Sequence, residues 1–278
     1  MKKLAIAVFA LCVLGTGAFA MKLTNPLYMP GEGRIMSDTE GTFTNTRGGG
    51  SNKVFALSQS LSYGIMERLQ LGAEVGYIYA SDADVNGVYN PAVFGFYRIA
   101  DEEITFDLGA SVRLGLYETD VANRDYSYSL IARAGRDMEE FSFGCSLAFT
   151  LNSFDSDDSG SIRPPCILCA YESHKPPAAA MVVAAGSGSS SSTTTKDLGA
   201  RIFGIYNIDD NMGLGAEAGY ALNSMGETFK FNSYQLLARF DYIFGETTGL
   251  KFYAGLGGTD QKGDDGSYFA GAVLRLLF

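Results

Sequence analysis

The chain ends in GAVLRLLF, residues 271–278, an apolar run that closes a protein with a formal net charge of -10. Chain ends are usually polar and poorly ordered unless something ties them down. One face of the final stretch carries Tyr268, Ala270, Ala272, Leu274, Leu276 and Phe278. The other face carries Phe269, Gly271, Val273, Arg275 and Leu277. A period of two residues predicts a β-strand, so the deciding question is what its apolar face contacts.

The same alternation recurs along most of the chain. It is clearest in residues 69–79, 104–116, 141–151 and 212–222. Weaker alternation covers residues 33–45, 54–65, 88–99, 124–135, 197–208, 231–242, 250–259 and 267–278. Soluble strands usually have about 5–6 residues, whereas these have roughly twice that length. Segments of about ten residues with a dyad pattern are typical of transmembrane β-barrels, so we predict an all-β, single antiparallel barrel of about twelve strands. A soluble β-sandwich is the alternative.

The predicted connections alternate between short and long. Short ones fall near residues 66–68, 100–103, 136–139, 209–211 and 243–249. Longer ones fall near residues 46–53, 80–87, 118–123, 152–196, 223–230 and 260–266. A barrel with an even number of strands and both termini in the periplasm predicts short periplasmic turns and longer extracellular loops. A sandwich gives no reason for this alternation.

Aromatic side chains on the apolar face fall into two groups. Near the longer connections lie Tyr77, Tyr79, Tyr89, Tyr117, Tyr126, Tyr128, Tyr220 and Tyr268. Near the short connections lie Tyr63, Tyr97, Phe106, Phe141, Tyr206, Tyr242, Phe252 and Phe278. Amphipathic rings prefer the two interfaces of a membrane, so two aromatic belts are expected if this face contacts lipid.

The first twenty residues have the pattern of a secretory signal peptide. Lys2 and Lys3 precede the apolar run of residues 4–14, and Ala18-Phe19-Ala20 provides a cleavage site. We therefore expect residues 1–20 to be removed and residues 21–278 to form the barrel. Loss of the two lysines makes the exported chain still more acidic. Nucleic-acid binding relies on basic surface, so we expect no nucleic-acid partner.

With these features the chain resembles the bacterial outer-membrane β-barrel proteins over nearly all of the exported sequence. Tyr268, Leu274, Leu276 and Phe278 resemble the C-terminal assembly signal of these proteins. The resemblance implies a location in the outer membrane of a Gram-negative-type envelope, contact with its lipid, and recognition by the barrel-assembly machinery. It does not assign a function, because this fold hosts channels, enzymes, adhesins and structural anchors.

Residues 152–196 depart from the pattern and are predicted to form a long low-complexity extracellular loop or insertion. Cys166, Cys169 and His174 supply three potential zinc ligands there, whereas a structural zinc site usually needs four. The alternative is a disulfide or free thiols in a flexible loop. We therefore predict no metal or other cofactor, and we note the loop as a candidate contact for an extracellular ligand.

The strand registers turn a set of charged side chains toward the lumen. They are Arg98, Arg113, Arg133, Arg201, Arg239, Arg275, Glu74, Asp107, Glu217 and Asp241. Rings of arginine can select anions in a channel. Alternatively, the arginines and carboxylates neutralise each other in a salt-bridge network, and the near balance of signs favours this second interpretation.

The residue types on the predicted strands help to separate an enzyme from a channel. The outer-membrane hydrolases that this chain would resemble use a histidine in or near the barrel, but the only histidine here is His174 in the low-complexity loop. We therefore expect no enzymatic activity. The sequence predicts a small porin-like passive channel for hydrophilic solutes. The alternative is a non-conducting barrel that presents its extracellular loops for surface interaction or envelope structure.

Overall fold

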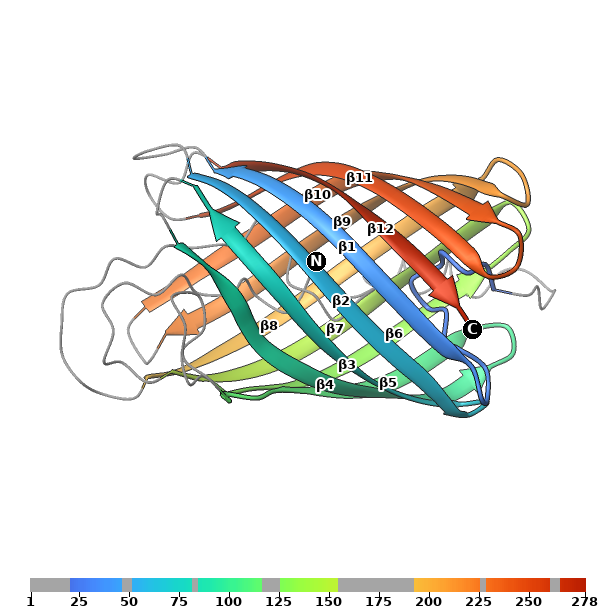
Figure 1. Ribbon diagram of the computed structural model, residues 1–278, viewed down its shortest axis with the longest axis horizontal. Coiled ribbons are helices and arrows are strands. Elements are labelled where there is room, and N and C mark those ends of the chain that lie inside the picture. Colours follow the sequence, from blue (N-terminus) through green and yellow to red (C-terminus); the bar gives the residue numbers. More distant parts are fainter. Residues whose placement is uncertain are drawn as a thin grey trace, which may run out of the picture.

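The chain forms one closed antiparallel β-barrel of twelve strands (Figure 1). The computed structural model describes residues 21–46, 52–81, 85–116, 126–154, 193–225, 229–260 and 266–278. Each strand pairs with its neighbours in the sequence, and the last strand returns to pair with the first. The predicted all-β barrel is confirmed, and the sandwich alternative is wrong. Within the described ranges, no helix has the length and apolar character needed to cross a membrane.

All twelve predicted strands are present, and most differ from their predicted bounds by a few residues. They are β1 Ile35–Thr46, β2 Asn52–Met66, β3 Leu69–Ala80, β4 Val85–Asp101, β5 Thr105–Arg113, β6 Tyr126–Asp137, β7 Phe141–Phe154, β8 Thr193–Asn207, β9 Met212–Met225, β10 Phe229–Phe244, β11 Thr248–Thr259 and β12 Ser267–Leu277.

Pairing of β12 with β1 closes the barrel. The register places Arg275 opposite Asp38 and runs from Met36–Leu277 to Thr46–Ser267. At the chain end, Ile35 and Phe278 exchange two backbone hydrogen bonds, with N–O distances of 3.0 and 2.8 Å. The apolar C-terminus is therefore the last strand of a closed sheet, and closure removes the free edge that an open sheet would expose.

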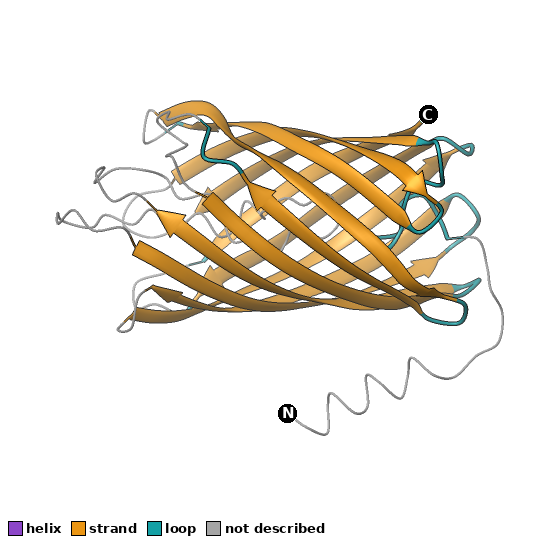
Figure 2. Ribbon diagram, turned by 90° about the horizontal axis from the view of Figure 1, so that it is seen from below, coloured by secondary structure: helices purple, strands orange, loops and turns teal. Residues whose placement is uncertain are grey.

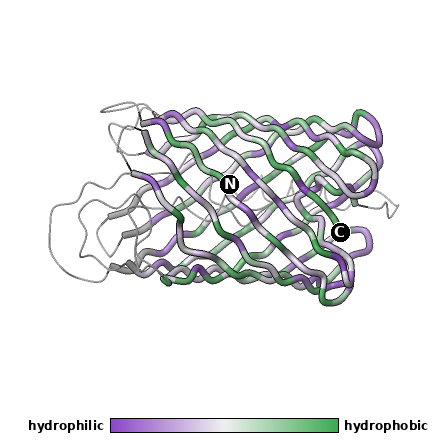
Figure 3. The backbone as a smooth tube through the Cα atoms, viewed as in Figure 1, coloured by the Kyte–Doolittle hydropathy of each residue, from purple (hydrophilic) through white to green (hydrophobic). Residues whose placement is uncertain are grey.

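The outer wall of the barrel is apolar. In β3, for example, Leu71, Tyr77 and Tyr79 are exposed, while Gln70 and Glu74 on the opposite face are buried. Green and purple segments accordingly alternate along the strands in Figure 3. Monomeric soluble proteins rarely expose a continuous apolar surface of this extent, whereas a lipid-facing barrel wall requires one.

The two ends of the barrel differ. At the end where the chain terminates (Figure 2), consecutive strands are joined by residues 67–68, 102–104, 138–140, 208–211 and 245–247. We call this the short-turn end. At the opposite, long-loop end, the strands are joined by residues 47–51, 81–84, 114–125, 155–192, 226–228 and 260–266. The predicted alternation is confirmed for three of the six connections at the long-loop end by a clear margin, residues 114–125, 155–192 and 260–266. Residues 81–84 and 226–228 are connections as short as those at the other end, and residues 47–51 are only slightly longer.

Strands β7 and β8 extend farther than predicted. Their pairing continues to Phe154 and Thr193, so residues 152–154 and 193–196 belong to the barrel wall. The long connection between them is therefore residues 155–192. This connection lies outside the described residues, as do Tyr117 and residues 1–20.

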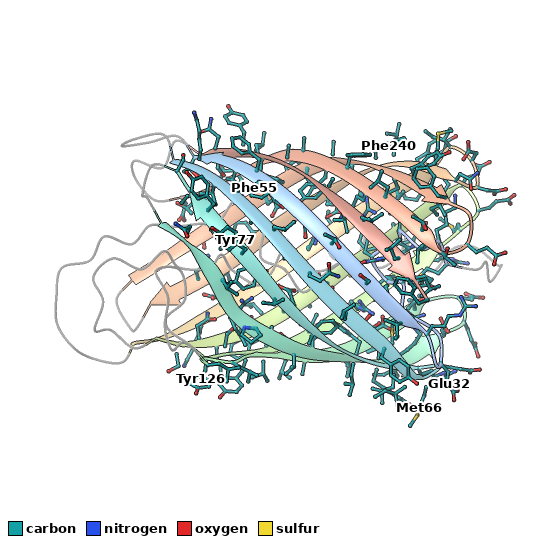
Figure 4. All side chains as sticks on the ribbon, in the orientation of Figure 1. Glu32, Phe55, Met66, Tyr77, Tyr126 and Phe240 are labelled. Carbon is teal, nitrogen blue, oxygen red and sulfur yellow. The ribbon has the colours of Figure 1, made fainter. Side chains whose placement is uncertain are left out.

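Exposed aromatic side chains lie near both ends of the barrel. Tyr63, Tyr206 and Phe252 are exposed near the short-turn end. Tyr77 and Tyr126 are exposed near the long-loop end, where Figure 4 labels both of them. This arrangement agrees with the two predicted aromatic belts.

Tyr89 is a correction to the predicted belts. It is only 5% exposed and faces the lumen, because a bulge in β4 reverses the alternation between Tyr89 and Ala92. Gly76 pairs with Tyr89 and Glu74 pairs with Ala92, which leaves Asn90 and Pro91 between the two registers. Proline lacks a backbone N–H and therefore favours such an irregularity.

The sequence also allows a bulge near Asn232 in the tenth predicted strand, but none is observed. Strand β10 pairs with both of its neighbours through continuous registers over the described residues. The interruption of the pattern at Asn232 therefore reflects a polar residue in a regular strand.

Candidate functional site

The inner wall of the barrel is rich in small hydroxyl side chains. Those buried on this face include Ser58, Ser60, Ser62, Ser111, Ser127, Ser129, Ser146 and Thr150. Ser129 and Thr150 face each other from β6 and β7, with their hydroxyl oxygens 2.9 Å apart. Because side chains alternate between the faces of a strand, the apolar outer wall requires these polar residues to point inward.

The predicted inward charges are buried inside the barrel, and all but Glu74 and Arg113 lie in clusters of ion pairs. In the first cluster, Asp107 of β5 lies between arginines of the adjacent strands. Its carboxylate accepts a hydrogen bond from Arg98 Nε at 2.9 Å and from Arg133 Nε at 2.6 Å. Arg98 also contacts Asp101 at 3.4 Å, at the short-turn end. Arg133 in addition lies over the ring of Phe96, 4.0 Å from its centroid.

A second cluster lies on β8, β9 and β10. Arg239 Nη1 donates to Glu217 Oε1 at 2.8 Å, and Arg239 Nη2 lies 2.8 Å from Asp241 Oδ2. Arg201 contacts the other carboxylate oxygen of Glu217. Two guanidinium groups and two carboxylates therefore share one buried site.

A third cluster joins β12 to β1. Arg275 binds Asp38 through two parallel hydrogen bonds, Nε to Oδ1 and Nη2 to Oδ2, both 2.8 Å long. This bidentate geometry fixes the orientation of the guanidinium group. Sequence analysis missed Asp38, because the first strand alternates poorly and its partner lies 237 residues away.

Farther from the short-turn end, a smaller group of polar residues surrounds Tyr89, which faces the lumen. The Tyr89 hydroxyl donates to Glu74 Oε1 at 3.0 Å, and Arg113 Cζ lies 5.0 Å from the ring centroid. The distance is within the range of a cation–π interaction. The bulge in β4 thus supplies the aromatic partner for two predicted lumen residues, Glu74 and Arg113.

The three ion-pair clusters share a partner that sequence analysis did not find. Residues 22–30, which we call the lumen segment, lie inside the barrel before β1 begins. Arg275 Nη1 donates to the carbonyl of Leu23 at 2.8 Å, Arg239 Nη2 to Thr24 at 2.9 Å, and Arg98 Nη2 to Leu27 at 2.5 Å. One arginine from each cluster therefore binds the lumen segment.

Apolar contacts hold the same segment. Leu27 packs against Phe203 and Ile205 of β8. Leu23 packs against Met36 of β1 and Leu277 of β12. Met29 packs against Phe94 and Phe96 of β4. Each of these three segment side chains is buried, so both its carbonyls and its apolar side chains contact the wall.

The segment is also tied down at its start. The backbone N–H of Lys22 donates to Asp137 Oδ2 of β6 at 3.3 Å, and Lys22 Nζ donates to the carbonyl of Asp209 at 2.5 Å. Burial raises the pKa of Tyr28 above its ordinary value, although nearby Arg34 and Arg275 oppose this shift. Tyr28 is therefore neutral at physiological pH.

One sequence signal could have indicated the lumen segment. Residues 23–30, LTNPLYMP, are mostly apolar, contain two prolines and lack strand alternation. Such a stretch, neither signal peptide nor strand, favours burial, and the barrel interior offers space for it.

Sequence analysis noted three potential zinc ligands but predicted no metal site. Cys166, Cys169 and His174 lie outside the described residues. Among the residues that are described, no group of three or more histidine, cysteine, aspartate or glutamate side chains is arranged to hold a metal ion. The Cys145 side chain lies on the outer wall, as the register of β7 predicts.

Comparisons with known proteins support the fold through structure alone. No protein-family model matches the chain, and no curated protein matches its sequence. An outer membrane channel from Pseudomonas putida F1 is similar in structure, with a TM-score of 0.61, 13% sequence identity, and coverage of 93% of this chain and 100% of that one.

Two autotransporter domains are more distant in structure. The β domain of BrkA from Bordetella gives a TM-score of 0.47 at 15% identity and covers 87% of this chain and 98% of that one. The translocator domain of NalP from Neisseria meningitidis gives 0.46 at 13% identity and covers 87% of each chain. Together with the barrel topology and the apolar outer wall, the similarity to the Pseudomonas channel shows that the chain has the fold of a bacterial outer-membrane β-barrel protein.

Proposed function

We propose that the protein is a passive channel for small hydrophilic solutes in the outer membrane. The observation that carries this proposal is the contrast between the two faces of the barrel wall. The outer face is apolar, while the inner face carries serines, threonines and paired charges. Such a wall offers polar groups to solutes in the lumen and an apolar surface to lipid outside.

The size of the barrel is compatible with conduction. Barrels of about 8 strands are filled by side chains, whereas barrels of about 16 strands enclose an aqueous channel. This barrel has twelve strands and many small side chains on its inner face. We infer a narrow pathway for small solutes.

The paired charges favour weak ion selectivity. Each of Arg98, Arg239 and Arg275 binds at least one wall carboxylate, so little net charge faces the axis from these groups. A ring of unpaired arginines would select anions. We therefore propose that the arginines do not form an anion filter.

The proposed location also assigns roles to two groups of residues. Removal of residues 1–20 on export, with the short-turn end in the periplasm, fits the predicted signal peptide. Tyr268, Leu274 and Phe278 are exposed on the outer wall, Leu276 lies beside them, and all four are available to barrel-assembly machinery and then to lipid. No catalytic step is proposed. An extracellular ligand for residues 152–196 stays a prediction.

Planar-bilayer recording of the refolded chain without residues 1–20 tests the proposal. We expect discrete current steps and a reversal potential close to zero in a potassium chloride gradient. The unfolded protein and empty detergent serve as controls. A folded barrel that never conducts, whether or not it contains the lumen segment, would favour the non-conducting alternative.

A further inference from the structure

We propose that the lumen segment, residues 22–30, is a removable gate at the short-turn end of the barrel, and that Arg98, Arg239 and Arg275 are its anchors. This inference rests on the proposed channel function and adds regulation to it. Figures 1 and 2 show the segment at that end of the barrel, directly ahead of β1 in the chain.

The segment reaches the wall on all sides. Its hydrogen bonds and apolar contacts come from β4, β6, β8, β10 and β12. These strands are distributed around the closed sheet. The inward-pointing Asp38, Asp107 and Arg239 are buried at the level of the segment. We infer that the segment obstructs the path of a solute through this end while it is in place.

The arginines are oriented to hold main-chain carbonyls. Asp38 accepts hydrogen bonds from Nε and Nη2 of Arg275, and Nη1 of the same guanidinium group donates to the carbonyl of Leu23. Arg239 is held in a similar way by Asp241 and Glu217, and its Nη2 also reaches the carbonyl of Thr24. Guanidinium groups only donate hydrogen bonds, and the segment presents acceptors to them. The wall carboxylates thus position the anchors and neutralise their charge.

The wall has a recess for the segment. An ideal Cβ atom at Gly249 would lie 3.0 Å from Thr24 Cγ2, and one at Gly135 would lie 2.5 Å from Leu27 Cδ1. Glycine at these two inner-wall positions lets the segment approach the strands closely. Since ordinary strand interiors disfavour glycine, this fit is a second observation that the segment has a defined seat.

The segment is built to move as a unit. Asn25 N–H donates to the Lys22 carbonyl at 2.9 Å, Tyr28 N–H donates to the Asn25 carbonyl at 3.0 Å, and Leu27 N–H donates to Asn25 Oδ1 at 2.8 Å. These turns satisfy part of its backbone internally, and the segment itself has no strand pairing. Gly33, with φ of +74°, lies between the segment and β1. Release therefore leaves the barrel sheet intact.

A disulfide that locks the segment provides the first test. Thr24→Cys with Gly249→Cys is introduced where Cys145, Cys166 and Cys169 are replaced by alanine. The side chains at positions 24 and 249 are close enough for a bond without moving the strands. We expect oxidation to abolish current steps and dithiothreitol to restore them. Thr24→Cys alone and Gly249→Cys alone should not respond, and mass spectrometry confirms that the bond has formed.

Removal of the gate provides the second test. Deletion of residues 22–30 should keep the channel open. Arg275→Lys should raise the open probability by about tenfold, because the charged hydrogen bond from Arg275 to the segment is lost. Lysine keeps the positive charge beside Asp38, so the reversal potential should not move. Ser267→Ala, at the opposite end of β12, is the matched control and should behave like the unaltered protein.

The outcomes separate the two proposals. If the oxidised lock conducts like the reduced form, the gate is wrong and the channel stands. If Arg275→Lys shifts the reversal potential without changing the open probability, Arg275 is a selectivity residue and the anchor assignment is wrong. If neither the unaltered barrel nor the deletion conducts although both fold, the channel function itself is wrong and the gate is overturned with it.

Discussion

Asp107 illustrates how single residues hold the interior together. Its side chain is fully buried and serves two arginines at once, Arg98 and Arg133. Removal of one partner of a buried ion pair leaves an uncompensated charge, and the cost is about 3–5 kcal/mol. The net energy of the two ion pairs is therefore less important than the cost of the uncompensated buried charge that loss of the carboxylate would leave.

We predict that Asp107→Asn lowers the free energy of unfolding by about 3–5 kcal/mol. The measurement is urea unfolding of the barrel in lipid vesicles. Asp101→Asn is the matched control, because the Asp101 side chain is 46% exposed and contacts the same Arg98 at 3.4 Å. An exposed pair contributes about 0–1 kcal/mol. Equal losses from the two variants would contradict the burial argument.

Leu147 tests the membrane assignment of the outer wall. It lies at the middle of β7 and is 56% exposed. We predict that Leu147→Arg destabilises the barrel in lipid vesicles by about 2–4 kcal/mol, since arginine is most costly at the bilayer midplane. Tyr206→Arg, near the short-turn end of β8, should cost only about 0–1 kcal/mol. A larger cost at Tyr206 than at Leu147 would place the membrane elsewhere.

At the residue scale, sequence alternation placed the inward arginines but not what they bind. A period of two assigns each side chain to a face, so Arg98, Arg239 and Arg275 could be assigned to the lumen. Their contacts with Leu23, Thr24 and Leu27 join residues 71 to 252 positions apart in the sequence. No local pattern encodes such contacts.

Among the elements, the strands were predictable and the lumen segment was not. Twelve alternating stretches became twelve strands, and the closing strand β12 ends within one residue of the predicted place. Tyr89 was assigned to the wrong face, because a one-residue shift at the Asn90–Pro91 bulge reverses every side chain beyond it. The lumen segment has no repeat, so its placement needed the assembled barrel.

The energetics of the lumen segment agree with a role as a gate. Its three hydrogen bonds to arginine contribute about 1.5–3 kcal/mol each. Burial of Leu23, Leu27 and Met29 contributes about 1.5–3 kcal/mol for each side chain. Ordering the backbone costs about 1–2 kcal/mol per residue over this short segment. The favourable and unfavourable contributions are of similar size, so small changes decide whether the segment stays in place.

The hairpin of β7 and β8 gives a prediction about residues 155–192. The two strands pair continuously from Phe141–Tyr206 to Phe154–Thr193, so their register does not need the connection. We predict that deletion of residues 160–190 preserves both folding and conductance, because the entropic cost of closing a shorter loop is smaller. Heat-modifiable gel mobility and bilayer recording measure the two properties. Loss of either would show that the connection has a structural or conducting role.

At the scale of the whole molecule, closure of the barrel explains why the C-terminus is apolar. Residues 271–278 complete the sheet against β1, place Leu274 and Phe278 on the outer wall, and turn Arg275 inward to Asp38. The fold follows from one pattern repeated around a ring. The function depends on the interior, where paired charges and the lumen segment determine what passes.

The most direct test is single-channel recording of the folded barrel that lacks residues 22–30, compared with the unaltered barrel in the same bilayer. We predict steady, weakly selective current steps for the shortened protein and less frequent openings of the same type for the unaltered one. An absence of current steps from both folded proteins would contradict the assignment of a passive channel.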